Sequence, residues 1–186
     1  MMERVASKDP SHAGWQQDLA DSHDDVADML SAQREFDAAL REYRTALEIR
    51  ERLVAKDAGY LRWQNDLALS HDNIGKVRLA QGDPDEALRE FRIALAGRET
   101  LAAKDPNNVG WQRGLASIHV AIGAVLIDQA QTEPGLGAYQ TALAILETLA
   151  AREPGNSALQ KELQSLHQKI NQARRETAVT GSGPKP

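Results

Sequence analysis

The sequence predicts an all-α protein, an α-solenoid built from antiparallel helix pairs. The phrase Trp-Gln-x-x-Leu-Ala begins at Trp15, Trp63 and Trp111 and so recurs with a constant 48-residue period. Self-similarity at a fixed period of this length is typical of stacked helical repeats. Apolar residues recur at helical spacing within each copy, and the alternating apolar and polar runs that mark strands are missing from the sequence.

The first helix of each unit carries one apolar stripe. Its members in the second copy are Trp63, Leu67, Ser70, Ile74 and Val77. They follow one another at i, i+4, i+7, i+11 and i+14, which places them on one face of a helix with 3.6 residues per turn. A neighbouring stripe is small and contains Ala68 and Gly75. We therefore expect the partner helix to approach closely there.

A turn and a second helix complete each unit. Gly82 is expected to end the first helix, Asp83 to cap the second, and Pro84 to occupy the second helix's first position. The second helix again has a single apolar stripe, formed by Ala87, Leu88, Phe91, Ala94, Leu95 and Leu101. In the third unit Pro134 and Gly135 weaken this helix start, and we expect a slightly shifted start in preference to a hinge.

These positions resemble the tetratricopeptide repeat (TPR) family in a long, 48-residue form. The residues that match the family's signature in the second copy are Ile74, Gly75, Ala87, Phe91 and Ala94. The resemblance implies a right-handed superhelix, and long arrays of this style resemble those attached to signalling or effector domains in bacterial proteins. The family's usual period is about 34 residues, so each helix here is expected to be longer, at about 20 residues.

The phase of the repeat divides the chain into parts. Residues 1–9 echo the end of a second helix, 10–57, 58–105 and 106–153 are three repeats, 154–176 is a C-terminal capping helix, and 177–186 is a disordered tail. A cap is expected because Gln164 and Asn171 replace the small stripe. The echo in residues 1–9 indicates either a fragment of a longer array or an array whose first repeat has eroded.

Composition argues against several classes of function. A net charge of -5 argues against nucleic-acid binding, which requires a basic surface. The absence of cysteine excludes disulfides, thiolate zinc sites and cysteine nucleophiles, and it fits a reducing cytoplasm. No apolar run approaches the roughly 20 residues that cross a membrane, and the first residues lack the apolar core of a signal peptide. We expect a cytoplasmic protein without membrane partners.

The histidines share one register but do not predict a metal or catalytic site. They are His23, His71, His119 and His167. Stacked repeats would hold them about 20 Å apart, whereas a metal needs ligands about 2 Å away. Semi-buried packing is therefore favoured, and the tryptophans are expected to pack in the core rather than stack on a ligand. We predict no catalytic residue, no metal and no cofactor.

The side of the first helices opposite the buried stripes is the candidate binding surface. In TPR arrays the first helices line a concave groove, so the resemblance places this surface there. Its candidate residues are Asp21, Asp24, Asp28, Leu69, Asp72, Lys76, Leu79, Ser117, Val120, Ala124 and Ile127. The series changes from acidic to apolar along the chain, and an exposed apolar run usually marks an interaction site. A merely solvated face is the alternative.

The favoured function is a protein-interaction scaffold, a module of a larger signalling or effector protein. Its ligand would be a peptide or partner protein that is basic with an apolar end. The alternative is a structural array that assembles with copies of itself by end-to-end stacking, which would make it a homo-oligomer. An enzyme is disfavoured because polar groups would have to converge in one pocket, whereas here they repeat along a rod.

Overall fold

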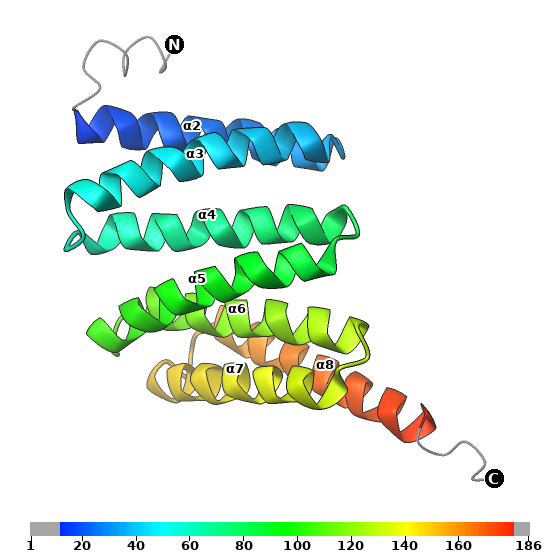
Figure 1. Ribbon diagram of the computed structural model, residues 1–186. Helices are drawn as coiled ribbons and strands as arrows, with labels where there is room; N and C mark the ends of the chain where they lie inside the picture. Colours follow the sequence, from blue (N-terminus) through cyan, green and yellow to red (C-terminus); the bar gives the residue numbers. More distant parts are fainter. Residues whose placement is uncertain (1–11, 181–186) are drawn as a thin grey trace. The chain divides into compact units, whose positions relative to one another are not determined.

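The computed structural model describes residues 12–180, and its backbone over this range forms seven helices and no strands (Figure 1). The helices are α2 (Ala13–Ala32), α3 (Phe36–Lys56), α4 (Leu61–Ala80), α5 (Pro84–Lys104), α6 (Val109–Asp128), α7 (Thr132–Arg152) and α8 (Ser157–Thr180). The prediction of an all-α protein made of helix pairs is confirmed. None of the helices in the described range is long and apolar enough to span a membrane.

The helices keep the 48-residue period of the sequence. The first helices α2, α4 and α6 start in step with it, at Ala13, Leu61 and Val109, and have 20 residues each. The second helices α3, α5 and α7 do the same and have 21 residues each. The start of α8 follows that of α6 by one further period. One helix-pair geometry is therefore maintained where the side chains have diverged.

Each first helix ends in the same tight turn. One residue has a left-handed backbone in every copy, with φ of 63° at Arg34, 83° at Gly82 and 60° at Ala130. The amide of the next residue donates to a carbonyl five residues earlier, as from Glu35 to Leu30 at 2.9 Å, which is the Schellman pattern. Only glycine adopts this conformation without steric cost, so the turn geometry outweighs that cost in the other two copies.

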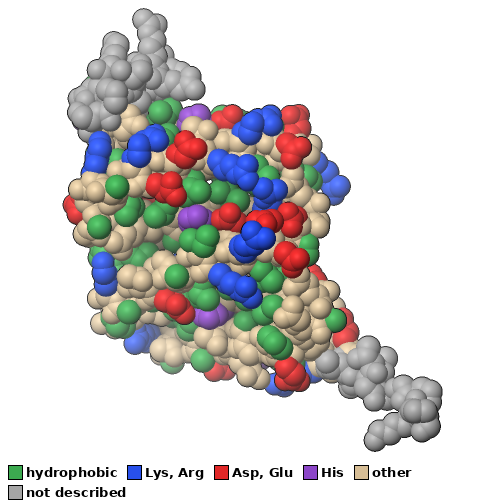
Figure 2. Space-filling view, in the orientation of Figure 1, with side chains coloured by type: hydrophobic (Ala, Val, Ile, Leu, Met, Phe, Trp, Pro, Cys, Tyr) green, Lys and Arg blue, Asp and Glu red, His purple; other side chains and the backbone are tan. Residues whose placement is uncertain are grey.

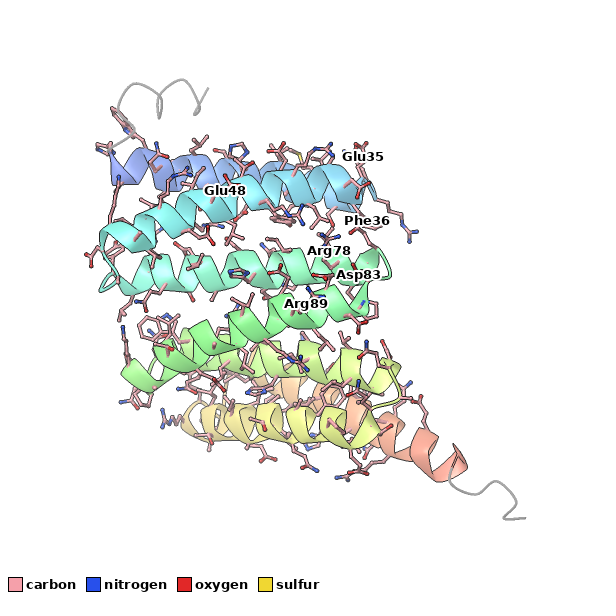
Figure 3. All side chains as sticks on the ribbon, viewed as in Figure 1. Glu35, Phe36, Glu48, Arg78, Asp83 and Arg89 are labelled. Atoms are coloured by element: carbon pink, nitrogen blue, oxygen red, sulfur yellow. The ribbon has the colours of Figure 1, made fainter. Side chains whose placement is uncertain are left out.

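The predicted start of the second helix is confirmed in the second copy. Pro84 is the first residue of α5, and the Asp83 carboxylate accepts a hydrogen bond from the backbone amide of Glu86 at 3.3 Å. Figure 3 shows Asp83 at this turn and Glu35 and Phe36 at the corresponding turn before α3. The turns therefore recur at the same end of both helix pairs.

Two helix boundaries differ from the sequence-based expectation. The start of α7 is in phase with α3 and α5, so the expected shift is wrong. Pro134 lies in the first turn of α7, where a missing amide proton leaves no helical hydrogen bond unmade. At the other end, α8 continues to Thr180, past the expected end at residue 176, because no glycine or proline interrupts residues 177–180. Residues 1–9 and the rest of the expected tail lie outside the described residues.

The chain divides into two units, Met1–Leu101 and Ala102–Pro186, and the boundary falls in the last turn of α5. In unit 1 one apolar cluster joins α2, α3 and α4 and a second joins α2 to α3. Members of the first include Leu40, Tyr43, Ile74 and Val77, and members of the second include Ala20, Ala46, Ile49 and Leu53. In unit 2 one cluster joins α6, α7 and α8. Each unit therefore has its own core.

Small residues let paired helices lie close together. A Cβ atom on Gly75 would lie 2.6 Å from Cε1 of Phe91, and one on Gly123 would lie 2.6 Å from Cδ1 of Tyr139. Both distances are far shorter than a carbon–carbon van der Waals contact. The predicted close approach of the second helix to the small stripe is therefore confirmed at these two positions.

Candidate functional site

The residues of the predicted binding surface lie in both units. In unit 1, α2 and α4 carry Asp21, Asp24, Asp28, Leu69, Asp72, Lys76 and Leu79. In unit 2, α6 carries Ser117, Val120, Ala124 and Ile127. Six members are exposed, namely Asp21, Asp28, Leu69, Lys76, Leu79 and Ser117. The others are half-buried or buried, and the reason differs between the units.

In unit 1 the main reason is Arg50, a side chain of α3 that is only 2% exposed. Its Nη1 lies 2.6 Å from Oδ2 of Asp24, and its Nη2 lies 2.8 Å from Oδ1 of Asp21. Nη1 also donates to Oγ of Ser70 on α4 at 2.7 Å. Charge-assisted hydrogen bonds from one guanidinium therefore tie α2, α3 and α4 together.

Burial and pairing act against each other on these groups. Burial raises the pKa of Asp24, and the nearby Arg50 guanidinium offsets only part of that effect. For Arg50, burial acts to lower the pKa, but the Asp24 and Asp21 carboxylates together raise it above its usual value. Removing Arg50 would leave the poorly solvated Asp24 carboxylate without its counter-ion, whereas removing Asp24 would leave Arg50 with Asp21 alone. The Asp24 carboxylate is therefore part of the core's polar network.

The same arrangement recurs one repeat later. Nη2 of Arg98 on α5 lies 3.2 Å from Oδ2 of Asp72 on α4, and Nζ of Lys76 lies 3.2 Å from the same oxygen. At the equivalent positions of the third repeat stand Leu146 and Val120. Leu146 is a member of the unit 2 core and Val120 packs against that core. Two repeats therefore fill this position with an ion pair and the third fills it with apolar side chains.

Asp24 and Asp72 are thus not free to bind a ligand. Their expected exposure is wrong, since each is engaged by an arginine from the following helix and Asp72 is only 4% exposed. Arg50 and Arg98 pair with these two predicted site residues and were not expected there from the sequence. A signal was present, because both arginines recur at the 48-residue period and lie within the apolar stripe of the second helix.

The exposed carboxylates of α2 form a row, which we call the acidic row. It consists of Asp18, Asp21, Asp25 and Asp28, all exposed. These residues follow at i, i+3, i+7 and i+10, so they share one side of the helix over about 15 Å. Between Ala13 and Ala32 the chain has no lysine or arginine. The acidic row therefore has no basic neighbour on its own helix.

Two members of the acidic row also make internal contacts. Asp21 shares the Arg50 guanidinium, although its side chain remains 50% exposed. Asp28 accepts a short hydrogen bond from the hydroxyl of Tyr43 on α3. Burial, together with this hydrogen bond and the charge of Asp28, raises the pKa of Tyr43 well above its usual value. The other two members, Asp18 and Asp25, can be changed without breaking these contacts.

A hollow of about 260 Å³ lies between the N-terminal ends of α2 and α4, next to the acidic row. Its lining residues are Ala13, Gly14, Gln17, Asp18, Tyr60, Arg62 and Trp63. Trp63 packs against the cluster formed by α2 and α3, as predicted, and the Tyr60 ring meets its indole edge-on at a centroid distance of 4.6 Å. The Trp63 side chain is nevertheless only half-buried, so it also borders the hollow.

The histidines pair with glutamates of the second helices. Nδ1 of His23 lies 2.6 Å from Oε2 of Glu42, and Nδ1 of His71 lies 2.7 Å from Oε2 of Glu90. Both imidazoles and that of His119 are half-buried, which confirms the predicted packing role at these positions, whereas His167 is exposed. In the third repeat Ala138 replaces the glutamate. Within residues 12–180 no three histidine or acidic side chains gather as ligands for one metal ion.

In unit 2 the predicted residues are governed by the core. Val120, Ala124 and Ile127 are half-buried and pack against the cluster formed by α6, α7 and α8, while Ser117 is exposed. Cγ1 of Ile127 occupies the space beside Gly135, where an added Cβ would lie only 2.5 Å away. Much of the apolar character of this face is therefore explained by packing within unit 2.

Several solved structures resemble the fold of this chain. BtubC (BKLC) from P. vanneervenii has a TM-score of 0.55 and 17% identity, with 90% of this chain and 67% of that chain covered. The Sgt2 TPR domain from Aspergillus fumigatus has a TM-score of 0.48 and 18% identity, with coverages of 90% and 85%. The de novo designed helical repeat protein DHR64 has a TM-score of 0.41 and 14% identity, with coverages of 96% and 90%.

No family model matches the chain, and no curated protein does either. At identities this low, structural likeness bears on the fold alone, because one fold hosts many unrelated functions. The helix pairs and their regular period describe a TPR-like helical repeat, and BtubC has a similar fold.

Proposed function

We propose that this chain is a protein-interaction scaffold and that its ligand binds the first-helix surface of unit 1. The observation that carries the proposal is the acidic row on α2, which has four exposed carboxylates and no cation on its own helix. Repeated helix pairs arrange chemical groups in rows rather than around one reacting atom. Such a surface suits an extended or helical ligand better than it suits catalysis.

The acidic row carries an energetic cost that a cationic ligand would remove. Like charges three or four residues apart on a helix each destabilise it by about 0.2–0.5 kcal/mol. Arg50 offsets this repulsion at Asp21 and Asp24, but Asp18 and Asp25 lie outside its ion pairs. By contrast, the face carried by α3 and α5 has acidic and basic side chains interspersed (Figure 2). The concentration of negative charge on α2 therefore favours a basic partner.

The neighbouring first helix adds an apolar component. Leu69 and Leu79 of α4 are 36% and 37% exposed, and Lys76 lies between them. Leu69 stands at the position of Asp21, and Lys76 at the position of Asp28, one repeat later. The favoured ligand is therefore basic at one part and apolar at another. Contact of its apolar part with Val120, Ala124 and Ile127 of unit 2 remains a prediction from the sequence.

The hollow beside the acidic row gives a basic side chain a specific place to bind. Asp18 supplies a carboxylate at its edge and the Trp63 indole borders it, while the exposed Arg62 that also lines the hollow lies 3.9 Å from the Asp66 carboxylate. A cation over an indole ring gains about 0.5–1 kcal/mol at an exposed site. We infer that an arginine or lysine of the ligand lies in this hollow. In the wider role that we propose, the chain is a cytoplasmic module of a larger signalling or effector protein.

A peptide-binding measurement tests the proposal. The probe is a short synthetic peptide with an arginine-rich half and a leucine-rich half, and its counterpart has glutamates in place of the arginines. The variant Asp18→Ser/Asp25→Ser removes two charges of the acidic row. The control Glu48→Ser/Glu51→Ser removes two exposed charges of α3, where Figure 3 marks Glu48.

We expect the basic peptide to bind and the acidic peptide not to bind. Loss of two exposed ion pairs is worth about 1 kcal/mol in total, so the Asp18→Ser/Asp25→Ser variant should bind about fivefold more weakly. The control should keep the affinity of the natural chain. Equal losses in both variants would show that overall charge, and not the acidic row, attracts the peptide, and the proposal would then be wrong.

A further inference from the structure

A second surface of α2 lies beside the acidic row and is apolar at its centre. It consists of Leu19, Ser22, Val26 and Met29, and we call it the apolar face of α2. Val26 is 39% exposed and Met29 is 58% exposed, while Leu19 and Ser22 are half-buried. This face adjoins the acidic row but shares no residue with it, so each surface can be changed by its own variants.

The corresponding face of α4 is fully covered. Ser70, Ile74 and Val77 stand one repeat after Ser22, Val26 and Met29, and they are 0%, 2% and 3% exposed. Side chains of α3 cover them, since Ile74 and Val77 share a cluster with Leu40 and Tyr43. The repeat itself therefore shows what kind of element fits such a face, namely one amphipathic helix.

The polar contact at this face points to an arginine in that helix. Arg50 of α3 donates to Ser70 Oγ at 2.7 Å, and Ser70 in turn donates to the backbone carbonyl of Asp66 at 3.2 Å. On α2 the same local arrangement is present, because Ser22 donates to the backbone carbonyl of Asp18 at 2.8 Å. The Ser22 hydroxyl is thus oriented as in the covered helix.

We propose that the apolar face of α2 is a docking site for one amphipathic helix of a partner protein, a helix that resembles α3. It would carry apolar residues at three- and four-residue spacing and an arginine that reaches Ser22. Charge complementarity at one position supports this occupant, because the arginine that reaches Ser22 would approach Asp18, which borders the face on a helix without lysine or arginine.

A second copy of this chain fits the face less well. Two α2 helices packed together would bring two acidic rows into proximity, and like charges at an interface cost binding energy. The outer side of α8 offers no apolar cover either, since its exposed residues include Gln164, Gln168 and Asn171. The partner helix is therefore the occupant that the chemistry favours.

The test uses the α3 sequence itself as the probe. A fluorescent synthetic peptide of residues 35–57 is titrated with the full chain. We expect binding, and we expect Val26→Lys/Met29→Lys to weaken it about tenfold or more, because each apolar side chain contributes to the buried area. A peptide carrying Arg50→Glu should also bind more weakly. The control variant Ile93→Lys, at a position of α5 that is 51% exposed, should bind like the natural chain.

Three results would overturn the proposal. The first is no binding of the α3 peptide to the natural chain. The second is unchanged affinity of the Val26→Lys/Met29→Lys variant, which would place the peptide elsewhere. The third comes from light scattering over a range of concentrations: if the chain alone forms oligomers and the same variant is a monomer, then a second copy occupies the face.

Discussion

The contribution of the buried ion pairs can be tested by placing the apolar side chains of the third repeat at the equivalent positions of the first. The third repeat has Leu146 and Val120 where the first has Arg50 and Asp24. We therefore consider Arg50→Leu and Asp24→Val singly and together. The double variant reproduces a pair of side chains that this fold already accommodates in the core of unit 2.

The structure sets the expected magnitudes. Breaking a buried ion pair by removing one partner costs about 3–5 kcal/mol, because the remaining charge is left without compensation. For Arg50→Leu we expect the lower end, about 3 kcal/mol, since the Asp24 side chain keeps 13% exposure and gains some hydration. For Asp24→Val we expect about 2 kcal/mol, because Arg50 retains Asp21 as a partner. The double variant removes both charges and should cost about 1 kcal/mol or less.

The assay is urea unfolding at neutral pH, followed by circular dichroism and by tryptophan fluorescence. Two probes are needed because helical repeats can unfold in steps, and a free energy from one transition is valid only when both probes agree. The double variant should be more stable than either single variant. A loss in the double variant equal to the sum of the two single losses, about 5 kcal/mol, would refute the reasoning, since it would show that the charges act independently.

Two further predictions concern the helix pairs themselves. Gly123→Ala should destabilise the chain by about 2–3 kcal/mol in urea unfolding, because its Cβ would lie 2.6 Å from the Tyr139 ring. The control is Gly137→Ala, whose Cβ would have no neighbour within 4 Å and which should stabilise the chain by up to about 1 kcal/mol. Equal effects of the two substitutions would contradict the close approach of α7 to α6 at Gly123. The pKa of Tyr43 is raised, so above the usual tyrosine pKa of about 10 the unfolded chain loses this proton before the folded chain does, and stability falls as pH rises. Tyr43→Phe should flatten that alkaline fall in the urea midpoint, and an unchanged slope would count against the Tyr43–Asp28 contact.

The fold could be predicted from the sequence because local sequence features specify each element of the repeat. The Trp63 phrase, the stripe that ends at Val77, and the turn at Gly82 each specify one element through spacing and backbone preference. Three copies of each feature reinforce one another. The start of α7 at Thr132 is instructive, because the turn pattern of the other copies determines it despite Pro134.

The binding surface could be predicted only in part. A helical wheel shows which side of α2 a carboxylate occupies, but it does not show whether a long side chain from another helix reaches it. Asp24 and Asp25 are neighbours in the sequence, yet Arg50 engages Asp24 while Asp25 is exposed. Such a distinction depends on the separation of two helices in space, so it required the structure.

The most direct test of the proposed function is a map of amide chemical shifts on the isotope-labelled chain as the arginine–leucine peptide is added at low salt. We expect the largest changes to fall on α2 between Asp18 and Asp28 and on α4 between Leu69 and Leu79, and to shrink as salt screens the charges. Changes concentrated on the outer side of α3 and α5, with α2 unaffected, would contradict the proposed function.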